Sequence, residues 1–378
     1  MKDGDLTGRH YATGKPVRIE WTSGRFSRIE QLPVDGLTLP WIAPPVFDLQ
    51  VNGFGGIDFQ RDDLSTDQLL VAVRALRESG CTRFLLTLIT DAWPDLLRRL
   101  AHIRTLRNAC PELHRAIAGW HVEGPFLSTE PGYHGAHNPA HMLDPNPTHL
   151  DELRAVTAED PLLLTLAPER PGAMETIRSA VQRGIRVSLG HTNADAATLL
   201  AAATSGATGF THLGNACPQT LDRHDNLLWR VFDTPGLTVG LIPDAIHVSP
   251  ALFRLVHRLI PSNAIYYTTD AMAAGGAPPG RYTIGTLELE VGEDQIVRQP
   301  GRSNFAGSAL RPVDGLRRAA VMLNQPWQRV WDHFSINPSR FMGLPTGFAL
   351  GDPAEFCLME TDGEGRIAQI ETIRSSQT

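Results

Sequence analysis

Short apolar runs alternate with longer amphipathic stretches from about residue 46 onward, and this alternation limits the possible fold more than any other feature of the sequence. The apolar runs have the length and composition of buried strands, and the stretches between them have helical spacing. Strands separated by helices predict a parallel sheet with both faces covered, and eight such units favour a closed (β/α)8 barrel of the TIM type. The eight predicted strands are 46–53, 81–90, 116–125, 162–169, 186–192, 209–216, 237–247 and 264–271.

The two ends of the chain have a different pattern. Residues 1–45 and 345–378 contain short alternating segments such as VRIEW and IAQIETI, without a helical period. We expect these ends to pair into one small, β-sandwich-like domain, while residues 46–344 form the barrel. The helices predicted between the barrel strands lie at about 66–79, 92–108, 149–158, 172–183 and 194–205.

Charge and composition limit the classes of partner. The 378 residues carry a formal net charge of −7 without a Lys/Arg cluster, which argues against nucleic acid as a partner. No apolar run approaches the roughly 20 residues that span a bilayer, and residues 1–21 lack the apolar core of a signal peptide. The four cysteines are widely spread and form no CxxC pair, so we expect reduced thiols and a cytoplasmic location. An anionic small substrate remains possible, because an acidic protein can form a local cationic pocket.

Metal-binding and acid–base side chains follow several of the predicted strands. Glu123, His191, His212 and Asp270 all come at the carboxyl ends of strands, where barrels of this type carry their active sites. Two neutral imidazoles and a carboxylate can hold a divalent ion such as Zn²⁺, and three protein ligands leave a position open for water. A nearby free carboxylate can then take the proton of that water.

Each of these residues also has a simpler interpretation. A histidine at a strand end can be a hydrogen-bonded structural group, Glu123 can cap the following loop, and Asp270 can be a helix N-cap. These simpler roles would have to hold independently at four corresponding strand ends. Their coincidence therefore favours a metal site, whereas Cys217 nearby is better explained by packing.

Eight segments of the sequence match one family in order. The chain resembles the N-acetylglucosamine-6-phosphate deacetylases of the amidohydrolase superfamily over nearly its whole length. NPSRFMGL followed by GFALGDPAEF is similar to the closing segment of that family. The eight segments are FDLQVNGFGGIDF (47–59), HVEGPFL (121–127), GAHNP (135–139), LGHTNADA (189–196), THLGNACPQ (211–219), DAIHV (244–248), TTDAMAAGG (268–276) and AGSAL (306–310).

The resemblance implies a role for each candidate residue. It implies that Glu123, His191 and His212 bind the metal and that Asp270 is the catalytic acid and base. It also implies contacts with the substrate: His137 on the acetyl carbonyl, His247 on the sugar and its amide, Asn215 and Ala216 on the phosphate or sugar, Arg223 on the phosphate across a dimer interface, and Phe305, Ala306 and Gly307 in a loop that closes over the substrate.

The first predicted strand indicates how many ions to expect. Many amidohydrolases carry HxH at the end of this strand, which supplies ligands for a second ion. Here the two positions are Gln50 and Asn52, and an amide is a poor ligand for a tightly held Zn²⁺. We therefore expect one divalent ion, in the first place Zn²⁺, although the same ligands accept Fe²⁺, Co²⁺ or Mn²⁺.

The expected function is metal-dependent hydrolysis of the acetamido group of N-acetylglucosamine 6-phosphate, giving glucosamine 6-phosphate and acetate. The expected oligomeric state is a homodimer. Two departures from the family pattern lie near the substrate: Ala245 replaces a usual glycine, and HDNLLWR follows Arg223. Two alternatives remain. One is a deacetylase of an unphosphorylated or differently configured sugar, such as N-acetylgalactosamine 6-phosphate. The other is a catalytically silent sugar-binding barrel.

Overall fold

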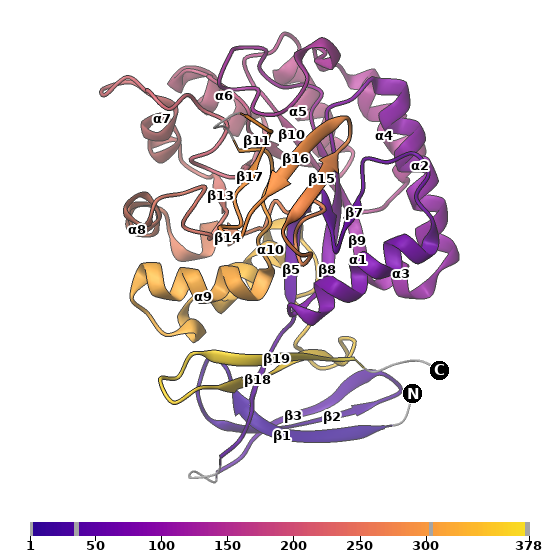
Figure 1. Cartoon of the computed structure of the whole chain (residues 1–378), viewed down its shortest axis with the longest axis vertical. Helices are drawn as coiled ribbons and strands as arrows, with labels where there is room; N and C mark the ends of the chain where they lie inside the picture. Colours follow the sequence, from indigo (N-terminus) through magenta and orange to yellow (C-terminus); the bar gives the residue numbers. More distant parts are fainter. Residues whose placement is uncertain (1–2, 34–37, 302–304, 375–378) are drawn as a thin grey trace.

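An eight-stranded parallel sheet forms the centre of the molecule in the computed structural model, which describes residues 3–33, 38–301 and 305–374 (Figure 1). Its strands follow one another in chain order, from the first to the last. A parallel bridge between Val51 and Ala271 links the first strand to the segment after the last, so the sheet closes into a barrel. The strands are β5(Val46–Val51), β8(Cys81–Ile89), β9(Ile117–Glu123), β10(Leu162–Leu166), β11(Arg186–Leu189), β12(Gly209–Phe210), β13(Thr238–Leu241) and β14(Ile265–Tyr267).

Helices cover the outside of this barrel, and the TIM-like prediction is confirmed. All eight predicted strands and all five predicted helices are present, although each of the eight strands ends before the predicted residue. The predicted helices are α1(Thr66–Glu78), α2(Trp93–Ala109), α4(Pro147–Thr157), α5(Ala173–Gln182) and α6(Ala196–Ser205). Those not predicted are α3(Pro111–Ala116), α7(Leu227–Asp233), α8(Pro250–Leu259), α9(Pro312–Leu323) and α10(Ile336–Met342), with four 3₁₀ turns at η1(Pro139–His141), η2(Ser262–Ala264), η3(Trp327–Arg329) and η4(Trp331–Phe334).

Side-chain caps mark where many of these helices begin. α1 starts with a complete capping box, in which the Ser65 side chain accepts from the Gln68 N–H and the Gln68 side chain accepts from the Ser65 N–H. Asp195, Asn226 and Ser249 cap α6, α7 and α8 in the same way, by accepting from backbone N–H groups of the first turn. Within the described residues, no helix is both long and apolar enough to pass through a lipid bilayer.

The two ends of the chain meet in one six-stranded mixed sheet, as predicted. Its order is β19-β18-β4-β1-β2-β3, so strands from the C-terminus pair directly with strands from the N-terminus. Figure 1 shows this sheet at one end of the barrel, with both termini beside it. Residues 1–2, 34–37 and 375–378 of the predicted domain lie outside the described part of the chain. The strands are β1(Gly4–His10), β2(Pro16–Thr22), β3(Arg25–Gln31), β4(Trp41–Ala43), β18(Glu355–Thr361) and β19(Ile367–Arg374).

A small three-stranded sheet, which the sequence did not predict, lies between β14 and α9 in the chain. It consists of β15(Gly280–Ile284), β16(Leu287–Val291) and β17(Val297–Arg298). A separate two-stranded sheet, β6(Gly53–Phe54) and β7(Ile57–Asp58), comes directly after β5 in the chain. Asp58 joins the two, because its Oδ2 accepts from Thr283 Oγ1 at 3.0 Å and from the Gly285 N–H at 2.9 Å. The sheet also holds Phe305 in place through an antiparallel bridge to Arg298.

A buried carboxylate joins the first and last barrel strands. Asp48 on β5 accepts from Thr268 Oγ1 at 2.5 Å, from Thr269 Oγ1 at 2.6 Å and from the Thr269 N–H at 3.1 Å. Burial raises the pKa of Asp48 to about 6, and hydrogen bonds from Thr268, Thr269 and the Gln50 N–H oppose part of that rise. These contacts add side-chain hydrogen bonds between β5 and the segment that follows β14, next to the bridge between Val51 and Ala271.

The half-buried side chain of His257 makes the stability of the fold depend on pH. His257 on α8 contacts Tyr267 Oη through Nε2 at 2.9 Å and packs edge-on against His333. Burial, followed by the charge of His333, lowers the pKa of His257 to about 3. The unfolded chain therefore binds a proton at His257 below about pH 6.5, where the folded chain does not, so this group removes stability as the pH falls.

Protonation of His257 in the unfolded chain is expected to lower the unfolding free energy by about 1–2 kcal/mol between pH 7 and pH 5. We expect His257→Gln to abolish this part of the pH dependence. Urea denaturation of the parent and the variant at both pH values measures this difference. His114→Gln is the matched control, because His114 lies exposed on α3 and its replacement is expected to leave the pH dependence unchanged. An unchanged pH dependence in His257→Gln would show that His257 does not titrate differently in the folded and unfolded chains.

Candidate metal and active site

Four barrel strands bring the candidate residues to one end of the barrel. Glu123 is the last residue of β9, and His191, His212 and Asp270 follow β11, β12 and β14. The last three have left-handed backbones, with φ of 50°, 33° and 51°. This conformation is uncommon outside glycine and costs of order 1–3 kcal/mol at each position. Its recurrence at three strand ends indicates that the surrounding structure holds these side chains in directions that a continuing strand would not give.

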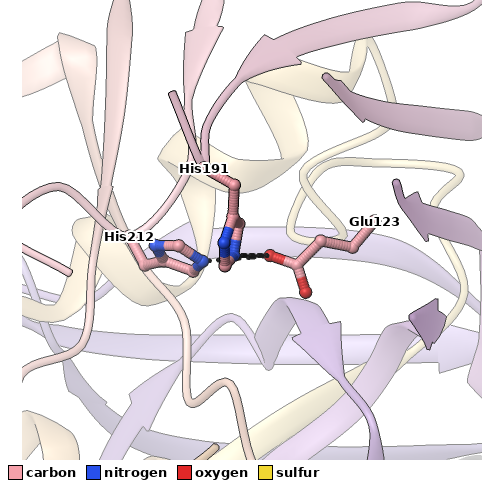
Figure 2. Close-up of side chains that lie close together, drawn as sticks. All are labelled: Glu123, His191 and His212. Atoms are coloured by element: carbon pink, nitrogen blue, oxygen red, sulfur yellow. Dashed lines mark hydrogen bonds and ion pairs between the residues drawn. The ribbon is translucent and has the colours of Figure 1, made fainter. Parts of the chain in front are cut away.

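Glu123, His191 and His212 form a compact group of ligand atoms (Figure 2). Glu123 Oε1 lies 3.0 Å from His212 Nε2 and 3.4 Å from His191 Nε2. All three side chains are buried, and the possible ligand atoms lie within 4.8 Å of one another. Among the described residues, this is the group of histidines, cysteines and carboxylates found at such spacing.

The spacing fits a divalent cation. Two ligand atoms bound at roughly 2.0–2.1 Å in a tetrahedral site lie about 3.4 Å apart, close to the separations around Glu123 Oε1. His191 Nδ1 contacts the carbonyl oxygen of Tyr133 at 3.0 Å, which places the ring proton on Nδ1 and leaves the Nε2 lone pair facing Glu123. Burial lowers the pKa of His191, which favours the neutral ring that a metal requires. The site can therefore hold one such ion.

The two amides at the end of β5 are directed toward the carboxylates of the site. Gln50 Nε2 donates to Glu123 Oε1 at 2.9 Å, and Asn52 Nδ2 donates to Asp270 Oδ1 at 2.7 Å. Both amides present N–H groups to these carboxylates, which favours the prediction of one ion. Asn52 Oδ1 is buried and has no partner in the described part of the chain, so it is available to a donor on water or substrate.

Asp270 lies close enough to Glu123 and His212 for their charges to shift the pKa of its carboxyl group. Burial, and then the charge of Glu123, raises the pKa of Asp270 to about 7, although the charges of His212 and His247 oppose part of the rise. A carboxyl group that titrates near neutrality can both accept and return a proton. Ser308 fixes the backbone at this position, because its N–H donates to the Asp270 carbonyl at 2.9 Å.

His137 completes the wall beside Glu123. Its ring is 4.4 Å from that of His191, and its Nε2 is 3.7 Å from Glu123 Oε2. Burial, and then the charge of His191, lowers the pKa of His137 to about 3. A neutral His137 can therefore contact a substrate without competing with a cation for Glu123.

His247 is held by a carboxylate from its own loop. Its Nδ1 lies 2.5 Å from Asp244 Oδ2, and no hydrogen bond of its Nε2 is found within the described part of the chain. Phe305 packs on the other side, with its ring centroid 5.2 Å from that of His247. Ala245, the residue after Asp244, is exposed and has φ of 61°, a conformation that favours glycine, so its Cβ strains the backbone.

The proposed phosphate residues are divided between the site and the surface. Asn215 follows His212 closely, and both its N–H and its Nδ2 donate to the His212 carbonyl, at 3.0 Å and 3.2 Å. Ala216 follows with φ of 51°. Arg223 is exposed, and no hydrogen bond or ion pair of its guanidinium is found among the described residues. The structure therefore brings Asn215 to the metal group but leaves Arg223 apart from it.

The segment after the three-stranded sheet places its three candidate residues differently. Phe305 is 39% exposed, whereas Ala306 is 2% exposed and packs into a small apolar cluster with Met272 and Leu289. Gly307 has φ of 68° and passes so close to Met272 that a Cβ would lie 3.3 Å from it. Only Phe305 thus offers its side chain to a ligand.

The sequence did not predict two residues that contact histidines of the site, Thr90 and Tyr133. Thr90 ends the predicted strand 81–90 and contacts His137 through both its N–H and its hydroxyl. Tyr133 contributes only a backbone carbonyl, to His191. Thr90 could have been found by applying the strand-end rule to that strand as well. The Tyr133 contact has no signal in the sequence, because any residue type supplies a carbonyl.

Known proteins with similar sequences are amino-sugar phosphate deacetylases. No family model matches the chain. The N-acetylglucosamine-6-phosphate deacetylase of Rattus norvegicus is 32% identical over 333 residues, which cover 84% of this chain and 79% of that protein. The N-acetylgalactosamine-6-phosphate deacetylase of Shewanella sp. is 30% identical over 349 residues, covering 90% of this chain and 81% of that protein.

A solved structure extends the likeness to the whole fold. An aspartate-to-alanine mutant of N-acetyl-D-glucosamine-6-phosphate deacetylase from Mycobacterium smegmatis, in complex with N-acetyl-D-glucosamine 6-phosphate, has a TM-score of 0.86 and 28% identity. The match covers 99% of this chain and 100% of that chain. With the barrel, the sheet from both termini and the buried Glu–His–His group already established, the chain belongs to the N-acetylglucosamine-6-phosphate deacetylase family of the amidohydrolase superfamily.

Proposed function

We propose that this chain hydrolyses the acetamido group of N-acetylglucosamine 6-phosphate, giving glucosamine 6-phosphate and acetate. The observation that carries this proposal is one buried site in which Glu123, His191 and His212 can hold a cation next to Asp270. The family relatives support the substrate class. A deacetylase is favoured over a catalytically silent barrel, because the chain belongs to a family of deacetylases and has Asp270 beside the Glu–His–His group.

Glu123, His191 and His212 would hold a divalent cation, which would supply Lewis-acid chemistry by lowering the pKa of a water molecule and polarising the acetyl carbonyl. Asp270 accepts the water proton as the C–O bond forms, and it returns that proton to the sugar nitrogen as the C–N bond breaks. Asn52 orients Asp270 for both transfers by holding its Oδ1. The products are acetate and the free amine, so one carboxylate serves first as base and then as acid.

The substrate contacts follow from the walls of the site. His137 Nε2 donates to the acetyl oxygen as negative charge develops on it. His247, oriented by Asp244, contacts the sugar and its amide, with Phe305 packed against its ring. Asn215 and the backbone at Ala216 bind the sugar or its phosphate. The four cysteines are free thiols, so the reducing cytoplasm is the proposed compartment.

The test of this function is a panel of N-acetyl sugars, each with and without a 6-phosphate, scored by release of free amine. We expect N-acetylglucosamine 6-phosphate to have the highest kcat/KM. The galacto-configured 6-phosphate is the second candidate, because the Shewanella relative is named for that substrate. A panel in which no N-acetyl sugar releases amine would overturn the function as a whole.

Arg223 tests the phosphate contact and the proposed homodimer together. Arg223→Ala is expected to raise KM for the phosphorylated sugar about tenfold, because a charge-assisted contact to phosphate is lost, and to leave the unphosphorylated sugar unaffected. Arg258→Ala, an exposed arginine on α8, is the matched control. An unchanged KM in Arg223→Ala would remove this residue from the phosphate site.

Mixed dimers show whether Arg223 acts across the interface. In a mixture of Arg223→Ala and Asp270→Asn chains, a site with intact Asp270 can receive Arg223 from its neighbour. We expect a mixture of these two variants to be more active than either variant alone. Without recovery, Arg223 acts within its own chain.

A further inference from the structure

Thr90 lies against His137 at the edge of the metal-binding group. It is the first residue after β8, and β8 pairs with β9 so that Ile89 lies beside Glu123. The Thr90 N–H donates to His137 Nδ1 at 3.3 Å, and Thr90 Oγ1 lies 2.8 Å from the same atom. Both side chains are buried, with exposures of 6% and 7%. Two groups of one residue thus meet a single ring nitrogen.

The backbone contact determines which nitrogen of His137 carries the proton. A backbone amide can only donate, so Nδ1 must present its lone pair to Thr90. The neutral ring then carries its proton on Nε2, on the side facing Glu123 Oε2 at 3.7 Å. The Thr90 hydroxyl has two acceptors within reach, His137 Nδ1 at 2.8 Å and the Glu123 carbonyl oxygen at 3.4 Å. With Nδ1 unprotonated, the nearer acceptor is Nδ1, so the hydroxyl favours the same tautomer as the backbone N–H.

The fold makes room for this hydroxyl. A Cβ at position 124 would collide with Thr90 Oγ1, so Gly124 leaves space for the threonine between the two strand ends. Gly124 also has φ of 86°, a conformation that favours glycine. The position of Thr90 is therefore set by the neighbouring strand and not by the flexible part of a loop.

We propose that Thr90 is a positioning residue for amide hydrolysis, which holds His137 in the tautomer that directs Nε2–H into the site. This inference rests on the proposed function, because the Nε2–H group acts on the developing acetyl oxyanion. Thr90 itself touches neither substrate nor cation. Its effect passes entirely through the orientation and tautomer of His137.

Thr90→Val tests the proposal, because it removes the hydroxyl but keeps the side-chain shape and the backbone N–H. We expect kcat to fall about tenfold while KM stays within about twofold, since the hydrogen bond supports a contact made mainly in the transition state. Thr90→Ser, which restores the hydroxyl, is expected to return kcat to within about threefold of the parent. A raised KM at unchanged kcat, or no rescue by serine, would overturn the proposal.

Two controls separate positioning from general loss of structure. Thr87→Val removes a buried hydroxyl on the same strand, where Thr87 Oγ1 accepts from the Val51 N–H, and is expected to leave kcat unchanged. In a His137→Gln background, Thr90→Val is expected to cause no additional loss of kcat. A full additional loss there would show that Thr90 acts independently of His137.

A measurement without substrate keeps this inference separate from the proposed function. In ¹⁵N-histidine-labelled protein, the signals of His137 are identified by their absence in His137→Gln. We expect the shifts of a ring protonated at Nε2 with Nδ1 accepting hydrogen bonds, and a weaker hydrogen-bond shift at Nδ1 in Thr90→Val. A proton on Nδ1 overturns the proposal even if the enzyme is a deacetylase, whereas failure of the sugar panel leaves this result intact.

Discussion

Asp270→Asn is expected to lower kcat about 10³-fold while the bound metal and the binding of N-acetylglucosamine 6-phosphate are retained. The amide of asparagine can still accept from Asn52, so the local structure persists, but it can neither take a proton from water nor return one to nitrogen. Steady-state release of free amine measures turnover. Calorimetric titration with the substrate measures binding.

The control for this variant is Asp144→Asn. Asp144 is exposed and pairs with Arg170, so removing its charge is expected to leave kcat unchanged. Near-normal turnover in Asp270→Asn would exclude Asp270 as the proton carrier. A variant that has also lost its metal would instead place Asp270 among the ligands.

Glu123→Gln is expected to lower metal affinity by at least about 100-fold and to abolish turnover. Its Oε1 faces both histidines, at 3.0 Å and 3.4 Å, and an amide lacks the negative charge that offsets a divalent cation. Losses of about 10–100-fold are typical when a group that only supports a ligand is removed, so a ligand itself should cost more. Competition with a chromogenic chelator measures the affinity, and elemental analysis measures the stoichiometry.

His137→Gln is the matched control for metal binding. His137 lies next to Glu123 and His191 but is proposed to contact only the substrate, so its variant is expected to keep one ion per chain while its kcat falls to a low but measurable level. Stoichiometric metal in Glu123→Gln would remove Glu123 from the ligand set. Two ions per parent chain would overturn the argument from Gln50 and Asn52.

Local sequence patterns were sufficient for most of the barrel. Buried strands such as β8 and β9 are continuous apolar runs because both faces of a parallel sheet are covered, and this pattern is visible without the structure. The missed α8 has a serine cap and proline at its start, signals that were present but not read. The three-stranded sheet at 280–298 was missed because its strands are short and half-exposed, so their hydrophobic pattern is weak.

The sequence by itself determined the barrel, the pairing of both termini, and the residue types that end the strands at Glu123, His191, His212 and Asp270. These predictions rest on hydrophobic patterns and residue types that can be read within short segments. Only the tertiary structure decided how the strand ends meet. Left-handed backbones turn three of these side chains, and contacts between distant segments orient the site, as between Asn52 and Asp270 or Thr90 and His137. Hydrogen bonds between segments far apart in the chain have no spacing rule, so the metal group was predictable from the sequence and its orientation was not.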